Sequence, residues 1–143
     1  MRKSRMASLS ILLVTTVAAA LPSPSVTFAD KSEELGVAGG NEACWFDFNN
    51  DGWTDLCTGG ALYRNEKGRK FVKVASPGSC IAADFDNDGF IDLYSWTRRK
   101  LYRNKGGKEF VEVPLPQLPG GSSLGACWGD FNNDGLIDLY VGG

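Results

Sequence analysis

The residues of this chain that could do chemistry are acidic side chains that recur at a fixed spacing. The pattern Asp-x-Asp/Asn-x-Asp-Gly-x-x-Asp occurs three times, starting at Asp47, Asp84 and Asp130. Each copy has a side-chain oxygen at positions 1, 3, 5 and 9 and a glycine at position 6. A hard cation such as Ca²⁺ takes six to eight oxygen ligands at about 2.3–2.6 Å. The pattern therefore predicts three loops that each bind a divalent cation.

The predicted ligands are the side chains at positions 1, 3, 5 and 9 and the main-chain carbonyl at position 7. This carbonyl can turn toward an ion because glycine at position 6 tolerates a positive φ. One or two waters would complete each site. The predicted ligands are Asp47, Asn49, Asp51, Trp53 and Asp55 in the first loop; Asp84, Asp86, Asp88, Phe90 and Asp92 in the second; and Asp130, Asn132, Asp134, Leu136 and Asp138 in the third.

Other interpretations of the loops fit less well. A single Asp-Asn-Gly run can be only a good turn, but three copies that all keep an acid at position 9 favour metal binding. A flexible set of protein oxygens fits Ca²⁺ better than Mg²⁺. Zn²⁺ is usually bound by histidine or cysteine, which the loops lack. An EF-hand would need Glu at position 12, where this chain has Thr58, Ser95 and Val141.

The second loop is the most acidic, because Asp86 stands where the other loops have Asn49 and Asn132. The sequence therefore predicts that the second loop binds calcium most tightly.

The segments around the loops have the pattern of short β-strands. Apolar runs precede the loops at residues 43–46, 81–83 and 126–129 and follow them at 56–57, 91–94 and 137–141, so each loop joins two strands of a hairpin. Third strands at 62–65 and 101–104 share the sequence Leu-Tyr-Arg-Asn, and fourth strands at 71–74 and 110–113 alternate with charged residues. The pattern predicts four-stranded antiparallel meanders, buried at the first strand and exposed at the last.

A repeat of about 40 residues that contains four strands is typical of a β-propeller blade. We expect an all-β fold with blade 1 at residues 41–75, blade 2 at 76–114 and the first half of blade 3 at 122–143. Residues 27–40 would be a detached outer strand and a linker, since 27–31 resemble the fourth strands. The propeller would be incomplete, either a fragment or a chain that associates with further blades or another chain.

The N-terminus has the three zones of a secretory signal peptide. Arg2, Lys3 and Arg5 precede an apolar run over residues 9–17 and a stretch of alanines. We expect a signal peptide at 1–20, with cleavage possible as late as 29, and no membrane span after its removal because the run is too short to cross a bilayer. The mature protein would be secreted, periplasmic or on the cell surface.

The four cysteines allow two disulfides in an exported chain. Cys44 and Cys57 flank the first loop and would lie nearly opposite each other across the hairpin, although buried free thiols explain the cysteines equally well. The formal net charge of −2 is close to neutral and gives no support for a nucleic-acid partner, so we expect none.

The repeated loop, with Ala-Cys-Trp-Gly-Asp-Phe at the third copy and Leu-Tyr-Arg-Asn after the first two, resembles the FG-GAP-like (VCBS-type) repeat. This repeat is similar to the calcium-loop blades of integrin α-subunit propellers. The resemblance implies a β-propeller whose loops bind Ca²⁺ through positions 1, 3, 5 and 9. The Phe-Gly and Gly-Ala-Pro signatures of the integrin-type repeat do not occur here.

Two functions follow as expectations. The first is a non-catalytic interaction or adhesion module, in which calcium holds the loops rigid for a protein or glycan partner. The second is a fragment of a propeller enzyme, a polysaccharide lyase or hydrolase. The second is less favoured because the chain has no histidine and its clustered carboxylates are already used as predicted metal ligands.

Overall fold

A computed structural model describes residues 26–118 and 124–143 of the chain. The predicted signal peptide at 1–20 lies outside the described residues. The first sheet contains β1 (Ala43–Phe46), β2 (Asp55–Thr58), β3 (Ala61–Asn65) and β4 (Phe71–Ala75), hydrogen-bonded in that order. All neighbouring strands in it are antiparallel. Residues 41–75 thus contain the predicted four-stranded meander.

The second sheet repeats the first. It contains β5 (Cys80–Ala83), β6 (Asp92–Ser95), β7 (Lys100–Asn104) and β8 (Phe110–Val113), again antiparallel and in chain order. A two-stranded antiparallel sheet follows, made of β9 (Gly125–Gly129) and β10 (Asp138–Gly142). The predicted all-β architecture of propeller-type blades is confirmed, and the described residues form no closed barrel or ring.

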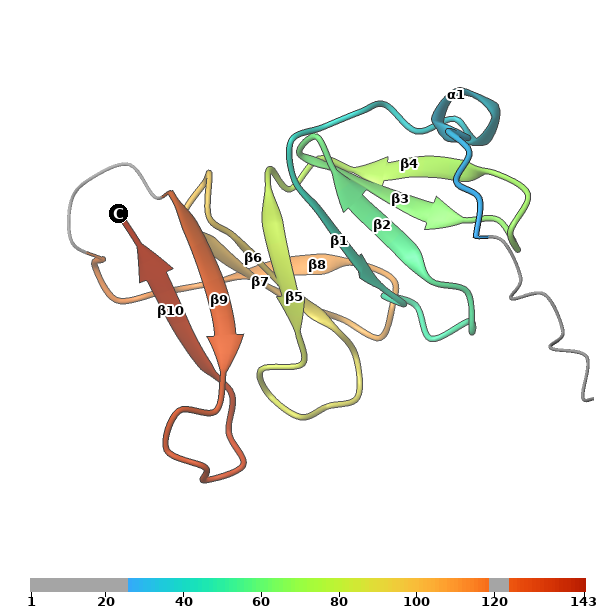
Figure 1. Ribbon diagram of the computed structural model, residues 1–143. Helices are drawn as coiled ribbons and strands as arrows, with labels where there is room; N and C mark the ends of the chain where they lie inside the picture. The colour runs from blue at the N-terminus through green and yellow to red at the C-terminus, as the bar shows by residue number, and fades with distance from the viewer. Residues whose placement is uncertain (1–25, 119–123) are drawn as a thin grey trace, which may run out of the picture.

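The three sheets lie side by side, as Figure 1 shows, and the acidic hairpin loops β1–β2, β5–β6 and β9–β10 all emerge on the same side of the molecule, at the bottom of that view. The first strands of the sheets are neighbours in space, with β5 in contact with both β1 and β9. This arrangement is that of consecutive propeller blades, whose innermost strands surround a common axis.

The core lies at the middle strands of each blade. Leu62 on β3 and Leu93 on β6 are fully buried. The prediction that the first strand is the most buried is wrong, because Trp45 on β1 keeps 60% of its surface exposed and only Phe46 of that strand is buried. An innermost strand has a neighbouring strand on one side only, whereas β2 and β3 are paired on both edges. The last strands β4 and β8 are partly exposed, as predicted.

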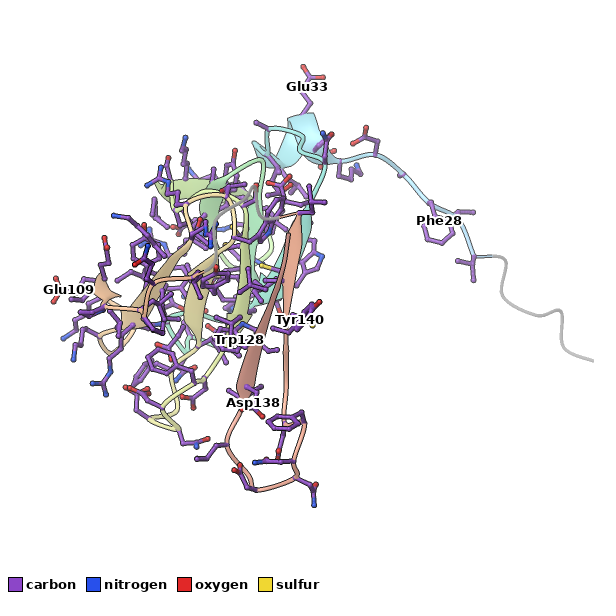
Figure 2. All side chains as sticks on the ribbon, turned by 90° about the vertical axis from the view of Figure 1, so that its left-hand side faces the viewer. Phe28, Glu33, Glu109, Trp128, Asp138 and Tyr140 are labelled. Carbon is purple, nitrogen blue, oxygen red and sulfur yellow. The ribbon has the colours of Figure 1, made fainter. Side chains whose placement is uncertain are left out.

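The segment before the first blade belongs to none of the three sheets. Residues 27–31 form no strand, and Phe28 is 95% exposed and extends away from the blades (Figure 2). That residues 27–40 contain a detached outer strand, such as one that completes the last blade of a closed ring, stays a prediction. A single helical turn, α1 (Ser32–Leu35), follows and ends at Gly36, whose φ of 76° is left-handed. In the described ranges, no helix combines the length and the apolar character needed to cross a bilayer.

Candidate metal-binding loops

The three acidic loops share one backbone conformation. Position 6 is a glycine with a φ of 84° to 86° in every copy, as the pattern predicts. Position 4 is also left-handed, with φ between 55° and 59° at Asn50, Asn87 and Asn133. Asparagine tolerates this region better than most residues. Two left-handed residues two positions apart turn the chain back over its own carboxylates.

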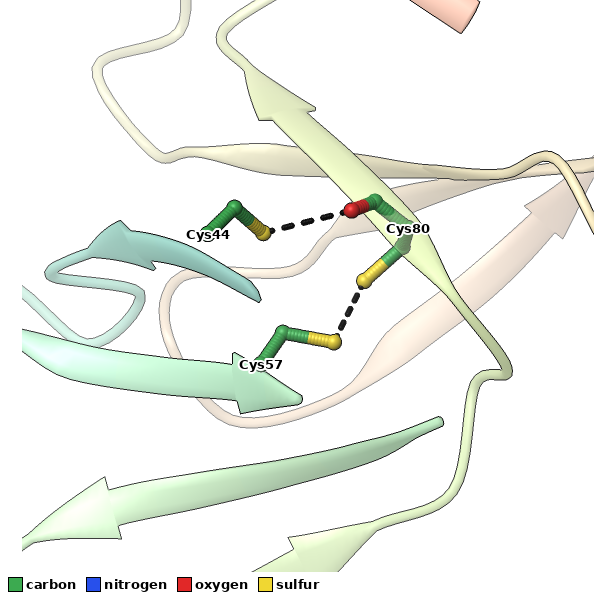
Figure 3. Close-up of side chains that lie close together, drawn as sticks. All are labelled: Cys44, Cys57 and Cys80. Atoms are coloured by element: carbon green, nitrogen blue, oxygen red, sulfur yellow. Dashed lines mark hydrogen bonds between the residues drawn. The ribbon is translucent and has the colours of Figure 1, made fainter. Parts of the chain in front are cut away.

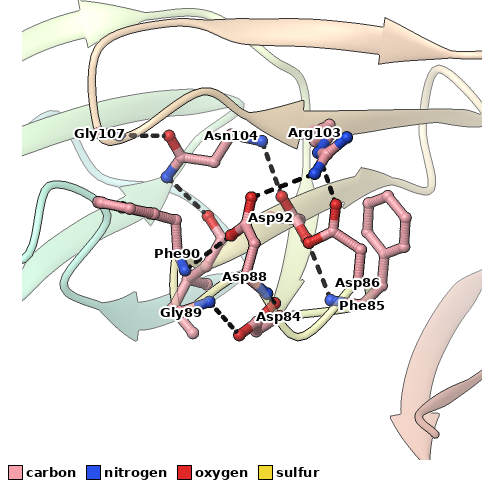
Figure 4. Close-up of polar contacts among 11 residues, drawn as sticks. Asp84, Phe85, Asp86, Asp88, Gly89, Phe90, Asp92, Arg103, Asn104 and Gly107 are labelled. Carbon is pink, nitrogen blue, oxygen red and sulfur yellow. Dashed lines mark hydrogen bonds and ion pairs between the residues drawn. The ribbon is translucent and has the colours of Figure 1, made fainter.

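The carboxylates at positions 1 and 5 organise the loop through main-chain hydrogen bonds (Figure 4). In the second loop, Asp84 Oδ1 accepts from the Asp88 N–H at 3.1 Å and its Oδ2 from the Gly89 N–H at 2.8 Å. Asp88 Oδ1 accepts from the Phe90 N–H at 3.0 Å. The first and third loops repeat all three bonds. The protein itself therefore holds these carboxylates in place.

Position 3 of the second loop completes a cluster of three acids. Carboxylate oxygens of Asp84, Asp86 and Asp88 all lie within 4.8 Å of one another. Asp86 Oδ1 is buried and has no hydrogen-bond partner. Because buried carboxylate oxygens are almost always satisfied, an unpartnered one beside two more carboxylates fits a bound cation.

Position 3 behaves differently in the other two loops, where it is asparagine. Asn49 Nδ2 donates to Asp51 Oδ2 at 3.0 Å, and Asn132 Nδ2 donates to Asp134 Oδ2 at 2.8 Å. These amides satisfy one oxygen of each position-5 carboxylate within the loop. Each asparagine still offers its own Oδ1 as a neutral ligand.

The acid at position 9 has a second role that the spacing did not predict. Asp92 is fully buried, and the cluster of three acids does not include it. Its Oδ2 accepts from the Phe85 N–H at 3.0 Å and its Oδ1 from the Asn104 N–H at 2.7 Å. Burial raises the pKa of Asp92, against these two hydrogen bonds, which lower it. Asp92 thus ties the loop to β7, and its role as a metal ligand stays a prediction.

Asp55 and Asp138 occupy the same place in the other loops. Asp55 is fully buried and accepts from the main-chain N–H groups of Phe48 and Asn65, while Asp138 Oδ2 accepts from the Phe131 N–H at 3.1 Å. Burial raises the pKa of Asp55 as well. Asp55 and Asp92 therefore brace their loops from the inside of the blade, whereas Asp138 is only partly buried and its bond lies within its own loop. Metal coordination by the position-7 carbonyls of Trp53, Phe90 and Leu136 stays a prediction.

Asn65 and Asn104, which end the two Leu-Tyr-Arg-Asn strands, also support the loops and were not among the predicted site residues. The N–H of each donates to the position-9 acid. The amide of Asn104 also donates to the Ile91 carbonyl at 3.0 Å and accepts from the Gly107 N–H at 2.8 Å, and Asn65 makes the same pair of contacts in blade 1. The signal in the sequence was the repeated Leu-Tyr-Arg-Asn motif, which is followed in both blades by a glycine three residues after the asparagine.

Arg103 is a second residue that the spacing did not reveal. Its Nε lies 2.5 Å from Asp86 Oδ2 and its Nη2 lies 3.4 Å from Asp88 Oδ2. The equivalent Arg64 in blade 1 pairs with Glu66 at 2.6 Å instead. The additional negative charge of the second loop is therefore partly balanced by a guanidinium that the first loop lacks.

The first two loops are joined to each other across the blade boundary. Asn50 Nδ2 donates to the Gly89 carbonyl at 2.9 Å, and Asn104 Nδ2 donates to the Phe48 carbonyl at 2.7 Å. The rings of Phe48 and Phe110 add a tilted contact with centroids 6.0 Å apart. The position of one loop therefore depends on that of the next.

Comparison with known proteins supports the blade-type repeat. A family model described as an FG-GAP-like repeat matches residues 84–141, which run from the start of the second acidic loop into β10. No curated protein and no solved structure gave a match to the chain.

Proposed function

Residues 84–141 carry an FG-GAP-like repeat, and from this premise we propose that the chain is an exported, calcium-binding module of the β-propeller type. Its loops would bind Ca²⁺ and present a rigid surface to a protein or glycan partner, without catalysis. The family match supports the blade architecture, and the acidic loops support the metal. The N-terminal sequence pattern supports export.

The observation that carries the proposal is the cluster of Asp84, Asp86 and Asp88. Three carboxylates within 4.8 Å of one another repel each other, and the buried Asp86 Oδ1 lacks a partner. A divalent cation would remove both costs. The ligands would be oxygens on a loop with two left-handed residues. Such a ligand set suits the size and variable coordination of Ca²⁺ better than the strict octahedral coordination of Mg²⁺.

The residues that would hold the ions are the position-1, 3 and 5 side chains of each loop, with position 9 bracing them. A bound ion supplies positive charge that neutralises the carboxylates and stiffens the hairpin. All three loops emerge on the same side of the molecule (Figure 1), so calcium would order three neighbouring loops on that side. Loops held by a rigid scaffold are where binding surfaces are commonly built. The acidic character of this face favours a partner other than nucleic acid.

A calcium-dependent melting experiment tests the metal. Thermal unfolding of the mature chain is followed under reducing conditions in millimolar Ca²⁺ and in excess chelator. Filling one site to about 100 times its Kd adds about 2.7 kcal/mol, so we expect a clear rise in Tm with Ca²⁺. The variant Asp84→Asn should lose part of this rise.

The matched control is Glu109→Gln, which removes an acid at an exposed position of the β7–β8 turn outside the acidic loops (Figure 2). It should keep the full Ca²⁺ response. Equal melting curves with calcium and with chelator would refute the calcium part of the proposal.

A further inference from the structure

Three cysteines that the metal-binding proposal does not use meet between blade 1 and blade 2. Cys44 lies on β1, Cys57 on β2 and Cys80 on β5, and their sulfurs all lie within 4.8 Å of one another (Figure 3). Cys57 and Cys80 are almost completely buried, at 2% and 5% exposure. All three are thiols in the structure.

The contacts of the three sulfurs are not equivalent. Cys57 Sγ and Cys80 Sγ lie 2.6 Å apart. Cys44 lies opposite Cys57 in the strand register, as the sequence indicated, but its Sγ donates to the main-chain carbonyl of Cys80 at 3.3 Å. The contact between the Cys57 and Cys80 sulfurs therefore crosses from one blade to the next.

The blade fold itself does not require thiols at these positions. When the repeats are aligned on their acidic loops, Ile81 and Tyr94 of blade 2 replace Cys44 and Cys57, and they pair in the same register. Ala126 on β9 replaces Cys80, and β9 contacts β5 as β5 contacts β1. The next boundary between blades thus uses ordinary apolar side chains where the first uses three cysteines.

We propose that Cys57 and Cys80 form a disulfide that joins blade 1 to blade 2, while Cys44 stays a thiol. A disulfide bond is about 2.05 Å long, so the two sulfurs need only a small movement. The two thiols would give up two protons and two electrons to a small-molecule or protein disulfide, which is reduced to two thiols as the new S–S bond forms. An oxidising compartment for this step rests on the proposed export.

The bond would change how the blades hold together. It would link β2 to β5 and enclose β3 and β4 in a covalent loop. Cross-linking restricts the unfolded chain, so oxidation should raise the Tm of the protein. A buried bond of this kind would also resist reduction by small thiols while the protein is folded.

The test uses the purified mature chain with glutathione disulfide, in chelator, followed by alkylation under denaturing conditions and peptide mapping by mass spectrometry. We expect a Cys57–Cys80 cross-link, alkylated Cys44 and Cys127, and a Tm above that of the reduced protein. Because this measurement needs neither calcium nor export, its failure would leave the calcium proposal standing, and the converse also holds.

Variants and competing outcomes sharpen the result. Cys57→Ser and Cys80→Ser should each abolish the oxidation-dependent rise in Tm, whereas Cys127→Ser, on the third hairpin, should keep it. A Cys44–Cys57 cross-link, or three alkylated thiols among Cys44, Cys57 and Cys80 after oxidation, would overturn the proposal. So would protection of all three thiols by Zn²⁺ that a chelator reverses, since this would identify a thiolate metal site. Mapping the unmodified chain gives an answer even where a variant fails to fold.

Discussion

At the scale of single residues, the charge of a loop depends on neighbours that its own sequence does not contain. Counting acids predicts that the second loop binds calcium most tightly, because Asp86 adds a carboxylate. In the structure Arg103 lies 2.5 Å from that carboxylate and would have to give it up, wholly or in part, to an ion. The expected advantage of Asp86 is therefore reduced by competition from a positive charge already in place.

The variant Arg103→Gln should strengthen calcium binding by the second loop. Removing a unit positive charge a few Å from the ion is worth about 1–2 kcal/mol at a partly exposed site, or roughly tenfold in Kd. Calorimetric titration of the mature chain with Ca²⁺ measures the change. Arg64→Gln is the matched control, because Arg64 pairs with Glu66 and no first-loop carboxylate is among its ion pairs. A weaker second site in Arg103→Gln would show instead that Arg103 orients Asp86 for the ion.

At the scale of strands and hairpins, most of the structure could be predicted because its signals are local. Apolar runs, turn glycines and the repeated Leu-Tyr-Arg-Asn place every described strand within about two residues of its observed bounds. Burial could not be predicted in the same way. An apolar run such as 43–46 gives no indication of how many neighbours the strand has, and β1, at the inner edge of its sheet, leaves Trp45 mostly exposed.

The two asparagines that end β3 and β7 differ in their contacts: one bonds only within its blade, and the other also bonds to the preceding blade. Asn104 is fully buried and its amide donates to Phe48 of the preceding blade as well as to Ile91. Asn65 makes the bonds within its own blade at a more exposed position. Comparing Asn104 with Asn65 therefore measures how much the hydrogen bond between the blades contributes to the free energy of unfolding.

Asn104→Ala should lower the free energy of unfolding more than Asn65→Ala does. Loss of the Asn104 amide leaves the buried Phe48 carbonyl unpaired, which costs about 1–3 kcal/mol beyond the bonds that both asparagines make. Urea denaturation in chelator measures the two changes without a contribution from the metal. If both variants lose the same stability, the hydrogen bond between the blades contributes nothing measurable.

At the scale of the whole molecule, sequence reasoning is least successful where residues from different repeats meet. Spacing along the chain suggested Cys44 and Cys57 as partners, since they flank one loop. In the structure the Cys80 sulfur of the next blade also lies 2.6 Å from that of Cys57. The joining of the first two loops through Asn50 and Gly89 also depends on the packing of neighbouring blades, which no local pattern indicates.

The proposed export makes a prediction for the whole chain. When it is expressed in a bacterial host with a secretory pathway, the exported product should begin at Leu21, which N-terminal sequencing or intact mass can show. Ala20→Arg should block cleavage there, because the cleavage site needs a small residue, and Ala29→Arg should leave it unchanged. A product that begins at Asp30 would show that cleavage follows Ala29 instead. An uncleaved protein confined to the cytoplasm would refute export.

The hydrogen bond from Asn50 to the Gly89 carbonyl has a consequence for how the protein would respond to calcium. An ion that orders the first loop also fixes the Asn50 amide, which donates to the Gly89 carbonyl of the second loop, so filling the second loop costs less conformational entropy. In repeat proteins such coupling acts between nearest neighbours. If both loops bind calcium as proposed, their occupancy would rise over a narrower range of calcium concentration than independent sites allow.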